Sequence, residues 1–517
     1  LEQLAVLKVK VKFRPGLRAV ESALSAASER EGLPREEVEE MSVPTYGLQE
    51  VGTGRVALGE FTAELVVTGT SDAELRWLKA DGKRQSSVPK SVREEHAEGL
   101  KELTAAVKDI RKMLPAQRDR VESLYLERKR WPLQLWRERY LDHPLVGTLA
   151  RRLVWKFTFG QHTASGIWHE GRLVRQDGRE VEGLCDETGV ELWHPIEEPT
   201  ADVLAWREWL DEHEVRQPFK QAHREVYLLT DAERATRVYS NRFAAHLVKQ
   251  HQFNALCAAR GWSNKLRLMV DDFYPPAARA MPAWGLRAEF WVEGAGDDYN
   301  AETVTEAGTY LYLSTDQVRF YRLDAPENYA HAGGGGYYGA TGTVDAPPVE
   351  PLPLQEIPPL VFSEVMRDVD LFVGVASVAN DPTWSDGGPE GRHRDYWHEY
   401  SFGHLSETAR TRRAVLERLV PRLKIAPRCR LADKFLVVRG DVRTYKIHLG
   451  SGNVLMEPND QYLCIVPSRG AQGGATQGKV FLPFEGDNTL AVILSKAFLL
   501  AEDTKITDPT IVRQIAE

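Results

Sequence analysis

Cysteines are scarce in this sequence, and long hydrophobic runs are missing. The four cysteines are far apart and form no CxxC pair: Cys185, Cys257, Cys429 and Cys464. This spacing excludes the usual zinc-finger and disulfide frameworks and indicates a reducing compartment. The longest apolar run, Leu490 to Ala501, is shorter than the ~20 residues that cross a bilayer. With no signal peptide visible, we expect a cytoplasmic protein without membrane segments.

The sequence also lacks a complete nucleotide-binding motif. In the stretch GGATQGKVFLPF, four residues separate Gly473 from Gly478 and Lys479, which is the P-loop spacing. Val480, however, stands where a P-loop needs the Ser or Thr that holds Mg²⁺. The residues that follow, with Pro483, favour a short strand over the helix whose N-terminus would bind phosphate. We therefore predict a Gly-rich loop between two strands, and no cofactor.

Length and composition are those of an ordinary globular protein. With 517 residues, of which 42% are hydrophobic and 27% charged, the chain is long enough for about two to four domains. We predict a multidomain α+β fold with antiparallel sheets. The predicted parts are an N-terminal α+β unit at 1–90, a helical segment at 91–160, a central α+β domain at 161–323, a Gly/Pro-rich linker or mobile loop at 324–359, and a C-terminal α+β domain at 360–517.

Local patterns predict the individual elements. Alternating or β-branched residues predict strands at 5–13, 224–229, 370–378 and 435–456, and an antiparallel sheet between 266 and 323. Helical spacing predicts helices at 17–32, 200–214, 405–424 and 490–501, the last one buried, and three more between 91 and 159. Asp177–Gly178 predicts a hairpin turn, and Asp508 with Pro509 is typical of a helix start.

The segment 324–359 differs from its surroundings in composition. It contains GGGG at 333–336 and then the run VDAPPVEPLPLQEIPP. Such a segment is typically a linker or a mobile loop. A PxxP strip that docks a partner is the less favoured alternative.

Two stretches contain residues that could bind an ion. KIHLGSGNV, at 446–454, fits an anion nest of backbone amides, but a hairpin turn with glycines at positive φ is favoured. His393, His398 and His404 are spaced by five and six residues, which does not place them on one helix face. We therefore predict no metal site.

Other chemistry-bearing residues form no known catalytic pattern. In Trp168–His169 and Trp193–His194, strand alternation predicts that each Trp packs in a core and each His points outward. No nucleophile elbow and no family-specific cysteine signature are present, so no catalytic residue is assigned.

Two basic segments, at 128–156 and at 410–446, are the most informative feature. The first interleaves its cations with Trp131, Trp136 and Trp155, and the second contains few acids. Solvated helix faces are the favoured interpretation, docking to an acidic protein surface (including the acidic region 177–214 of this chain) is second, and nucleic-acid binding is third. The residues predicted to contact an anionic partner are Arg128, Arg130, Arg137, Arg412, Arg413, Arg418, Arg443 and Lys446.

Several long stretches carry a resemblance to one family. They are VPTYGL, HPLVGTLARRLVW, SGIWHEGRLV, VELWHP, RDVDLFVGVASVANDP, RTYKIHLGSGNVLMEPNDQYLCIVP and ILSKAFLLAEDTKITDP. With them the chain resembles the bacterial domain-of-unknown-function 4132 family, which includes molybdate-metabolism-regulator-like proteins. The resemblance implies a C-terminal half or a short member. It also implies partners such as a MoxR-type AAA ATPase and a von Willebrand A protein, in a chaperone-like or conflict-related complex. It transfers no catalytic residue.

Three functions follow as hypotheses. The first is a non-enzymatic scaffold or adaptor in a bacterial ATPase-linked complex. The second is a nucleic-acid-binding or nucleic-acid-processing protein that uses the Arg/Trp segments. The third is an enzyme whose site is assembled from distant residues such as Arg443, His448, Glu457 and Asp460, which would have to meet in one cleft.

Overall fold

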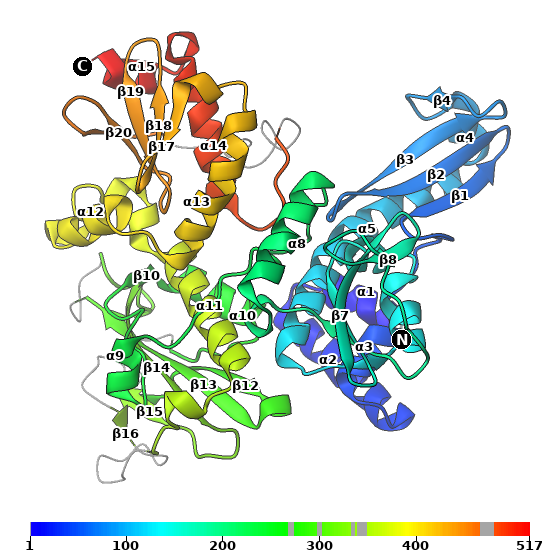
Figure 1. The fold of residues 1–517 in the computed structure, drawn as a ribbon, viewed down its shortest axis with the longest axis horizontal. Helices are drawn as coiled ribbons and strands as arrows, with labels where there is room; N and C mark the ends of the chain where they lie inside the picture. The colour runs from blue at the N-terminus through cyan, green and yellow to red at the C-terminus, as the bar shows by residue number, and fades with distance from the viewer. Residues whose placement is uncertain are drawn as a thin grey trace. The chain divides into compact units, whose positions relative to one another are not determined.

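The structure is a computed structural model that describes residues 2–266, 273–296, 302–331, 337–338, 349–465 and 480–516. The glycines of the near-P-loop, GGGG at 333–336 and residues 267–272, near the start of the predicted antiparallel sheet, lie outside these ranges. The chain divides into two compact units: unit 1 is Leu1–His223 with Leu482–Gly486, and unit 2 is Arg224–Phe481 with Asp487–Glu517. Both contain helices and antiparallel sheets, which confirms the multidomain α+β prediction (Figure 1).

Unit 1 begins with three helices, α1 (Glu2–Lys10), α2 (Arg14–Glu31) and α3 (Arg35–Met41). The strand predicted at 5–13 is therefore wrong. Its valines alternate, but Val6 and Val9 are also one helical turn apart, and both pack against the core of unit 1. The predicted end of the next helix is confirmed, since α2 stops at Gly32, whose φ of 66° suits glycine.

A four-stranded antiparallel sheet follows, with strands in the order β1 (Thr53–Leu58), β2 (Phe61–Thr68), β3 (Asp72–Lys79) and β4 (Arg84–Gln85). After α4 (Lys90–Glu95), α5 (Ala97–Ser123) packs against β3, and its helical stripe Val107, Ile110 and Leu114 is buried. The three helices expected between 91 and 159 are one long helix and several short turns. These turns are α6 (Leu133–Trp136), a π-turn (Arg137–Leu141) and α7 (Gly147–Ala150).

The second sheet of unit 1 has the strand order β5 (Trp131–Pro132), β9 (Gly189–Leu192), β6 (Trp155–Phe159), β7 (His162–His169) and β8 (Arg172–Val174). The predicted Asp177–Gly178 turn is present, because Gly178 N donates to Arg175 O. The helix predicted from Thr200 is α8 (Thr200–Glu212). The short strand predicted after Val480 is reduced to one parallel bridge, between Phe484 and Gln217.

Unit 2 is built on a sheet with the order β10 (Leu247–Lys249), β14 (Tyr312–Arg322), β13 (Leu286–Ala295) and β12 (Ala277–Met281). The pairs β12·β13 and β13·β14 confirm the predicted antiparallel sheet. A smaller sheet has the order β11 (Phe273–Tyr274), β15 (Tyr329–His331) and β16 (Tyr337–Tyr338). Helices α9 (Asp231–Thr236), α10 (Gln250–Ala259) and α11 (Pro359–Ala376) belong to the same unit.

Two predicted strands of unit 2 are wrong. Residues 370–378 continue α11 to Ala376, because Val365, Val369 and Phe372 are buried at helical spacing. Residues 224–229 are extended but join no sheet, and Tyr227 N donates to Ser363 Oγ of α11 instead.

The described end of the predicted linker, residues 349–359, is packed against unit 2. Leu352 N donates to Phe320 O of β14, and Leu354 N donates to Arg237 O. Leu354 and Ile357 are both buried. This part of the Pro-rich run is therefore anchored by backbone hydrogen bonds and by apolar contacts.

The C-terminal part of unit 2 contains α12 (Arg394–Phe402), α13 (Glu407–Leu419), α14 (Asn488–Ala501) and α15 (Pro509–Ala516). Its five-stranded sheet is antiparallel in chain order, with β17 (Cys429–Leu431), β18 (Phe435–Arg439), β19 (Thr444–His448), β20 (Val454–Met456) and β21 (Gln461–Leu463) (Figure 1). Helix α14 packs on β18 and β19, which confirms the predicted buried helix. None of the described helices combines the length and apolar character that crossing a bilayer requires.

Candidate functional site: a basic surface on the C-terminal sheet

Several cations of the first basic segment pair with acids of unit 1. Arg139 Nη1 is 2.8 Å from Glu40 Oε2, and its Nη2 is 2.9 Å from Glu37 Oε1. Lys156 Nζ is 3.3 Å from Glu197 and 3.5 Å from Glu198, two acids of the region 177–214. These cations therefore stabilise the fold that contains them.

The aromatic residues of this segment are in the core. Trp131, Trp136 and Trp155 are 4%, 0% and 0% exposed, so their faces are not available to stack on bases. Three of the predicted contact residues belong to this segment. Arg137 pairs with Asp142, whereas Arg128 and Arg130 are exposed. Arg128 has a positive φ of 50°.

The second basic segment has a large excess of cations. Residues 407–446 contain twelve Lys and Arg against four Asp and Glu, although the whole chain has a net charge of −9. Several of the twelve are paired. Arg412 Nε is 2.8 Å from the buried carboxylate of Asp487, and Arg413 contacts Glu417 at 3.1 Å. Arg412 is thus a structural residue and cannot contact a partner as predicted, because it is 9% exposed.

Apart from Arg443, which is described below, five cations of this segment are taken together because they have no ion pair among the described residues. They lie on α13, in its connection to β17, on β17, in the turn after it and at the end of β18. All but Lys434, which is half-buried, are exposed. We call them the basic surface: Arg418, Lys424, Arg430, Lys434 and Arg439.

Strand register places part of this surface on one sheet face. Arg430 is opposite Val437, and Val437 is opposite Lys446, so all three side chains share a face. Arg439 lies two residues after Val437 and points to the same face. The opposite face carries Leu436 and Val438, both fully buried. Arg430 and Arg439 therefore lie on the face opposite these two core residues, and Val437, on their own face, is 8% exposed.

The remaining predicted contact residues, Lys446 and Arg443, are partly engaged. Lys446 Nζ is 2.5 Å from Asp460, in the turn between β20 and β21. Arg443 Nε donates to Ile515 O at 2.7 Å, and this carbonyl is neutral. Arg443 therefore has no ion pair among the described residues, whereas Lys446 has one.

The residues of the enzyme hypothesis do not assemble. His448 is 1% exposed, and its ring contacts Gly403 O through Nε2 and Ser451 through Nδ1. Burial lowers its pKa to about 4, so the ring is neutral. Arg443, in contrast, contacts Ile515 of α15, and Glu457 and Asp460 are exposed in a turn. Of the four, only Arg443 and Glu457 line a common cavity.

The stretch KIHLGSGNV is a hairpin turn between β19 and β20, as favoured. His448 N donates to Asn453 O, and Gly452 adopts a φ of 72°. The donors at this turn are side chains that bind its carbonyls: Arg412 donates to Gly450 O and Lys496 to Gly452 O. It presents acceptors to the protein and is not an anion nest.

The Trp-His predictions have mixed outcomes, and the histidines belong to no metal-binding group that the structure describes. No group of three His, Cys, Asp or Glu among the described residues could hold a metal ion. Trp193 is buried as predicted, but His194 is also buried, and its Nδ1 accepts from Ile196 N. Trp168 is only half-buried and lies under the guanidinium of Arg151, at 4.9 Å. A hydrogen bond to the backbone accompanies the burial of His194, and Arg151 covers Trp168. Strand alternation alone therefore does not predict the burial of these two residues.

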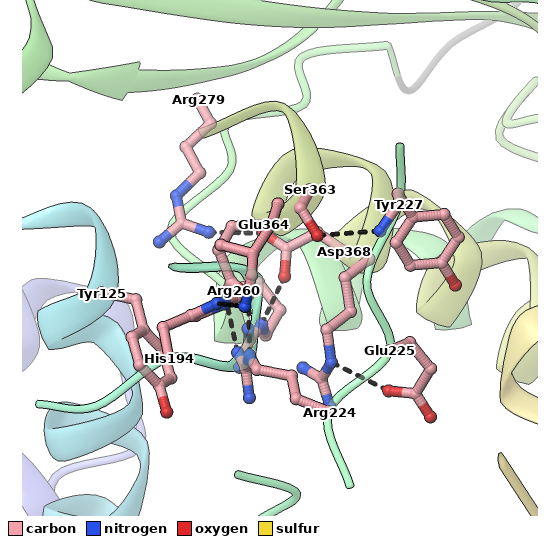
Figure 2. Close-up of polar contacts among 12 residues, drawn as sticks. Tyr125, His194, Arg224, Glu225, Tyr227, Arg260, Arg279, Ser363, Glu364 and Asp368 are labelled. Atoms are coloured by element: carbon pink, nitrogen blue, oxygen red, sulfur yellow. Dashed lines mark hydrogen bonds and ion pairs between the residues drawn. The ribbon is translucent and has the colours of Figure 1, made fainter. Parts of the chain in front are cut away.

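A second group of charges, which sequence patterns did not indicate, is buried around α11. Arg224 and Glu364 form two parallel hydrogen bonds of 2.7 and 2.6 Å (Figure 2). The Asp368 carboxylate, 0% exposed, accepts from Arg260 at 2.7 Å, from Trp262 at 2.8 Å and from Arg279.

Further acids of this group are also occupied by protein donors. Arg367 Nε donates to Glu225 at 3.1 Å, and Asp370 accepts from Tyr227 and from Thr408. Burial raises the pKa of Asp370, against the effect of these two hydrogen bonds. Because its charges are balanced and its carboxylates are filled by protein donors, this group stabilises unit 2 rather than offering a ligand site.

One signal in the sequence could have revealed this group. Between Val361 and Val373 the helix is apolar except for Ser363 and the four charged residues Glu364, Arg367, Asp368 and Asp370. Charges inside an otherwise buried helix must be paired, so their partners had to come from elsewhere in the fold. Which residues act as these partners, for example Arg224 and Arg279, depends on the tertiary structure.

Comparisons with known proteins give families without a known function. Residues 82–262 match the family described as Domain of unknown function (DUF4132), and residues 409–515 match the one described as Domain of unknown function (DUF7737). The first match supports the resemblance to the domain-of-unknown-function 4132 family. The second runs from α13 to α15 and includes the basic surface.

One curated relative is the "Uncharacterized protein YehI" of Escherichia coli (strain K12). It is 24% identical to this chain over 246 residues, which are 45% of this chain and 20% of that protein. The match thus spans about a fifth of the relative's length. No solved structure matches the chain.

Proposed function

We propose that the protein is a non-enzymatic adaptor that binds an acidic protein partner through the basic surface. The observation that carries this proposal is the set of five cations without ion pairs, Arg418, Lys424, Arg430, Lys434 and Arg439, within a chain of net charge −9. The buried arginines, in contrast, are paired with carboxylates, as Arg224 is with Glu364. Unpaired cations that come from one part of the chain, two of them on one sheet face, attract an anionic surface by long-range electrostatics.

An acidic protein suits this surface better than single-stranded nucleic acid does. Single-strand binders combine cations with exposed aromatic faces on which bases stack. Here Tyr445 is fully buried, and Phe435 is half-buried beneath Lys446 Nζ at 5.6 Å. The tryptophans of the first segment lie in the core of unit 1. The cations are thus available without a stacking platform, which leaves nucleic acid as the second candidate.

The family resemblance suggests which acidic partners to test first. A MoxR-type AAA ATPase and a von Willebrand A protein are the candidates, in the cytoplasm and in a stress- or conflict-related complex. A role in molybdate regulation has no support among the residues of this surface. These assignments remain predictions.

The test is affinity capture with the full chain and a charge-reversed variant. Tagged native protein and the triple variant Arg418→Glu, Arg430→Glu, Arg439→Glu are incubated with nuclease-treated host lysate at low salt. We expect a stoichiometric acidic protein to bind the native chain and to be lost from the variant. Because the attraction is screened, about 0.5 M salt should release it.

The matched control is a triple reversal in unit 1, Arg84→Glu, Lys108→Glu, Lys112→Glu. These residues are exposed and have no ion pair among the described residues, so the net charge changes equally. The control should retain the partner. Equal capture by both variants would refute the basic surface as the binding site. In a parallel capture from lysate without nuclease, binding that is absent from the treated lysate would favour nucleic acid.

A further inference from the structure

A cavity of about 560 Å³ lies at the end of the sheet that carries the basic surface. It is bounded by the β18–β19 turn, the β20–β21 turn and the end of α15. Its lining residues are Gly440, Val442, Arg443, Thr444, Glu457, Pro458, Ile515 and Ala516. Arg439 and Thr444 are cross-strand partners, so the cavity adjoins the basic surface directly.

The wall that carries Arg443 is fixed by Asp503. This carboxylate, 5% exposed, accepts from the backbone N–H groups of Asp441, Val442 and Arg443, at distances of 2.8 to 3.2 Å. Gly440 is required there, because a Cβ would lie 2.2 Å from the Asp503 oxygen. The turn is thus held in one conformation before any ligand binds.

Arg443 itself is oriented for binding an anion. Its Nε is committed to Ile515 O, at the C-terminal end of α15. Its two terminal nitrogens have no partner among the described residues, and the side chain lines the cavity. A guanidinium held in this way presents a planar pair of donors, which matches a carboxylate.

The rest of the lining selects the class of ligand. Val442, 56% exposed, stands with Pro458 and Ile515 as apolar lining. Glu457 adds one acceptor, which disfavours a bare polyanion and favours a ligand that also carries N–H groups. A peptide supplies carboxylate, apolar side chain and N–H donors together.

We infer that this cavity is a subsite for a peptide segment in which an apolar residue is flanked by acidic residues. An acidic side chain binds Arg443, the apolar side chain packs against Val442 and Pro458, and a peptide N–H donates to Glu457. The flanking acids extend toward Arg439 and Arg430. This inference rests on the proposed function, and it identifies the part of the acidic partner that binds.

The test uses two labelled, capped heptapeptides, EEELEEE and EEEAEEE, titrated into the full chain and followed by fluorescence anisotropy. We expect the leucine peptide to bind about tenfold more tightly, as partial burial of a large apolar side chain predicts. The variant Val442→Asp should remove this difference. Val375→Asp, at a position 47% exposed on α11, is the matched control and should preserve it.

The outcomes separate the two proposals. Equal, salt-sensitive binding of both peptides would overturn the subsite and leave the basic surface intact. Absence of binding by either peptide at 1 mM concentration, roughly the weakest affinity of interest, would overturn both. Arg443→Gln keeps a donor for Ile515 O and should weaken both peptides several-fold. An unchanged affinity in this variant would overturn the role of Arg443.

Discussion

The two basic segments have similar compositions, but the fold treats them differently. In the first, Arg139 and Lys156 each contact two glutamates of unit 1, and the tryptophans form the core. In the second, Arg430 and Arg439 are exposed on one face of a sheet and have no carboxylate partner in the part of the chain that the structure describes. Charge counts along the sequence cannot separate these cases, because the difference lies in where the acids are.

Arginine and lysine residues therefore have two different roles in this protein. A cation paired with a buried carboxylate contributes to stability, and its loss leaves an uncompensated charge. An exposed, unpaired cation contributes little to folding and remains available for a partner. Substitutions in the first group should therefore change unfolding, and those in the second should change binding.

Glu40→Ala should have the largest effect. Glu40 is 3% exposed and accepts from Arg139, Tyr140 and Trp131. Its removal leaves Arg139 with Glu37 alone, and it takes from the largely buried Arg120, 3.8 Å away, its ion pair. We expect a loss of about 3–5 kcal/mol in the free energy of unfolding, measured by urea denaturation. The exposed neighbour Glu36→Ala should change it by less than about 0.5 kcal/mol. Similar values for the two variants would contradict the neutralisation of the first segment.

Arg412→Gln should give the next largest effect, and it shows that the second segment is not uniform. The substitution removes the ion pair with buried Asp487, whereas glutamine can still donate to Gly450 O. We expect a loss of about 2–3 kcal/mol. Arg413→Gln, one residue along and half-buried, is the control and should cost below about 1 kcal/mol. Equal losses would mean that burial does not separate the two arginines.

Acidification should weaken the sheet beneath the basic surface. The folded-state pKa of His448 is lowered from 6.5 to about 4 by burial, with Arg412 and Lys434 adding to the effect and Glu399 opposing it. The unfolded state therefore binds the proton first as the pH falls below 6.5, and stability declines until about pH 4. The slope from this group is about 1.4 kcal/mol per pH unit.

The measurement is the free energy of urea unfolding of the full chain and of its His448→Gln variant, at pH 7 and at pH 5.5. His246 has a pKa lowered in the same way, so part of the slope persists in the variant. The difference between the native chain and the variant should shrink at pH 5.5 by about 1 kcal/mol. A constant difference would show that His448 takes up a proton equally in both states.

Much of the architecture could be predicted from the sequence, and the failures have physical causes. The helices from Thr200 and from Asn488 and the strands β18 to β20 follow their hydrophobic periods. The segments at 5–13 and 370–378 fit both periods, and packing made them helices. Residues 224–229 look like a strand but satisfy their polar groups on α11, as Tyr227 N does on Ser363.

The candidate site was predictable only in part. The excess of cations at 410–446 is visible in the sequence, and Arg418 is exposed as a contact residue must be. The sequence could not indicate that Arg412 forms an ion pair with Asp487, 75 residues away. Nor could it show that Arg430 and Arg439 share a face, because that depends on register. Pairing partners and register are tertiary facts, set by long-range contacts.

The last prediction compares two double variants in which cations are replaced by neutral glutamine. The variant of the second segment should have the smallest effect on stability. Arg430→Gln with Arg439→Gln removes two exposed cations without carboxylate partners, so the free energy of unfolding should change by less than about 0.5 kcal/mol. Arg139→Gln with Lys156→Gln removes ion pairs to buried or half-buried acids and should cost about 2 kcal/mol or more. Partner capture should show the reverse order. A loss of stability in the first pair as large as in the second would mean that its cations are structural after all, and the basic surface would lose its claim to be a binding site.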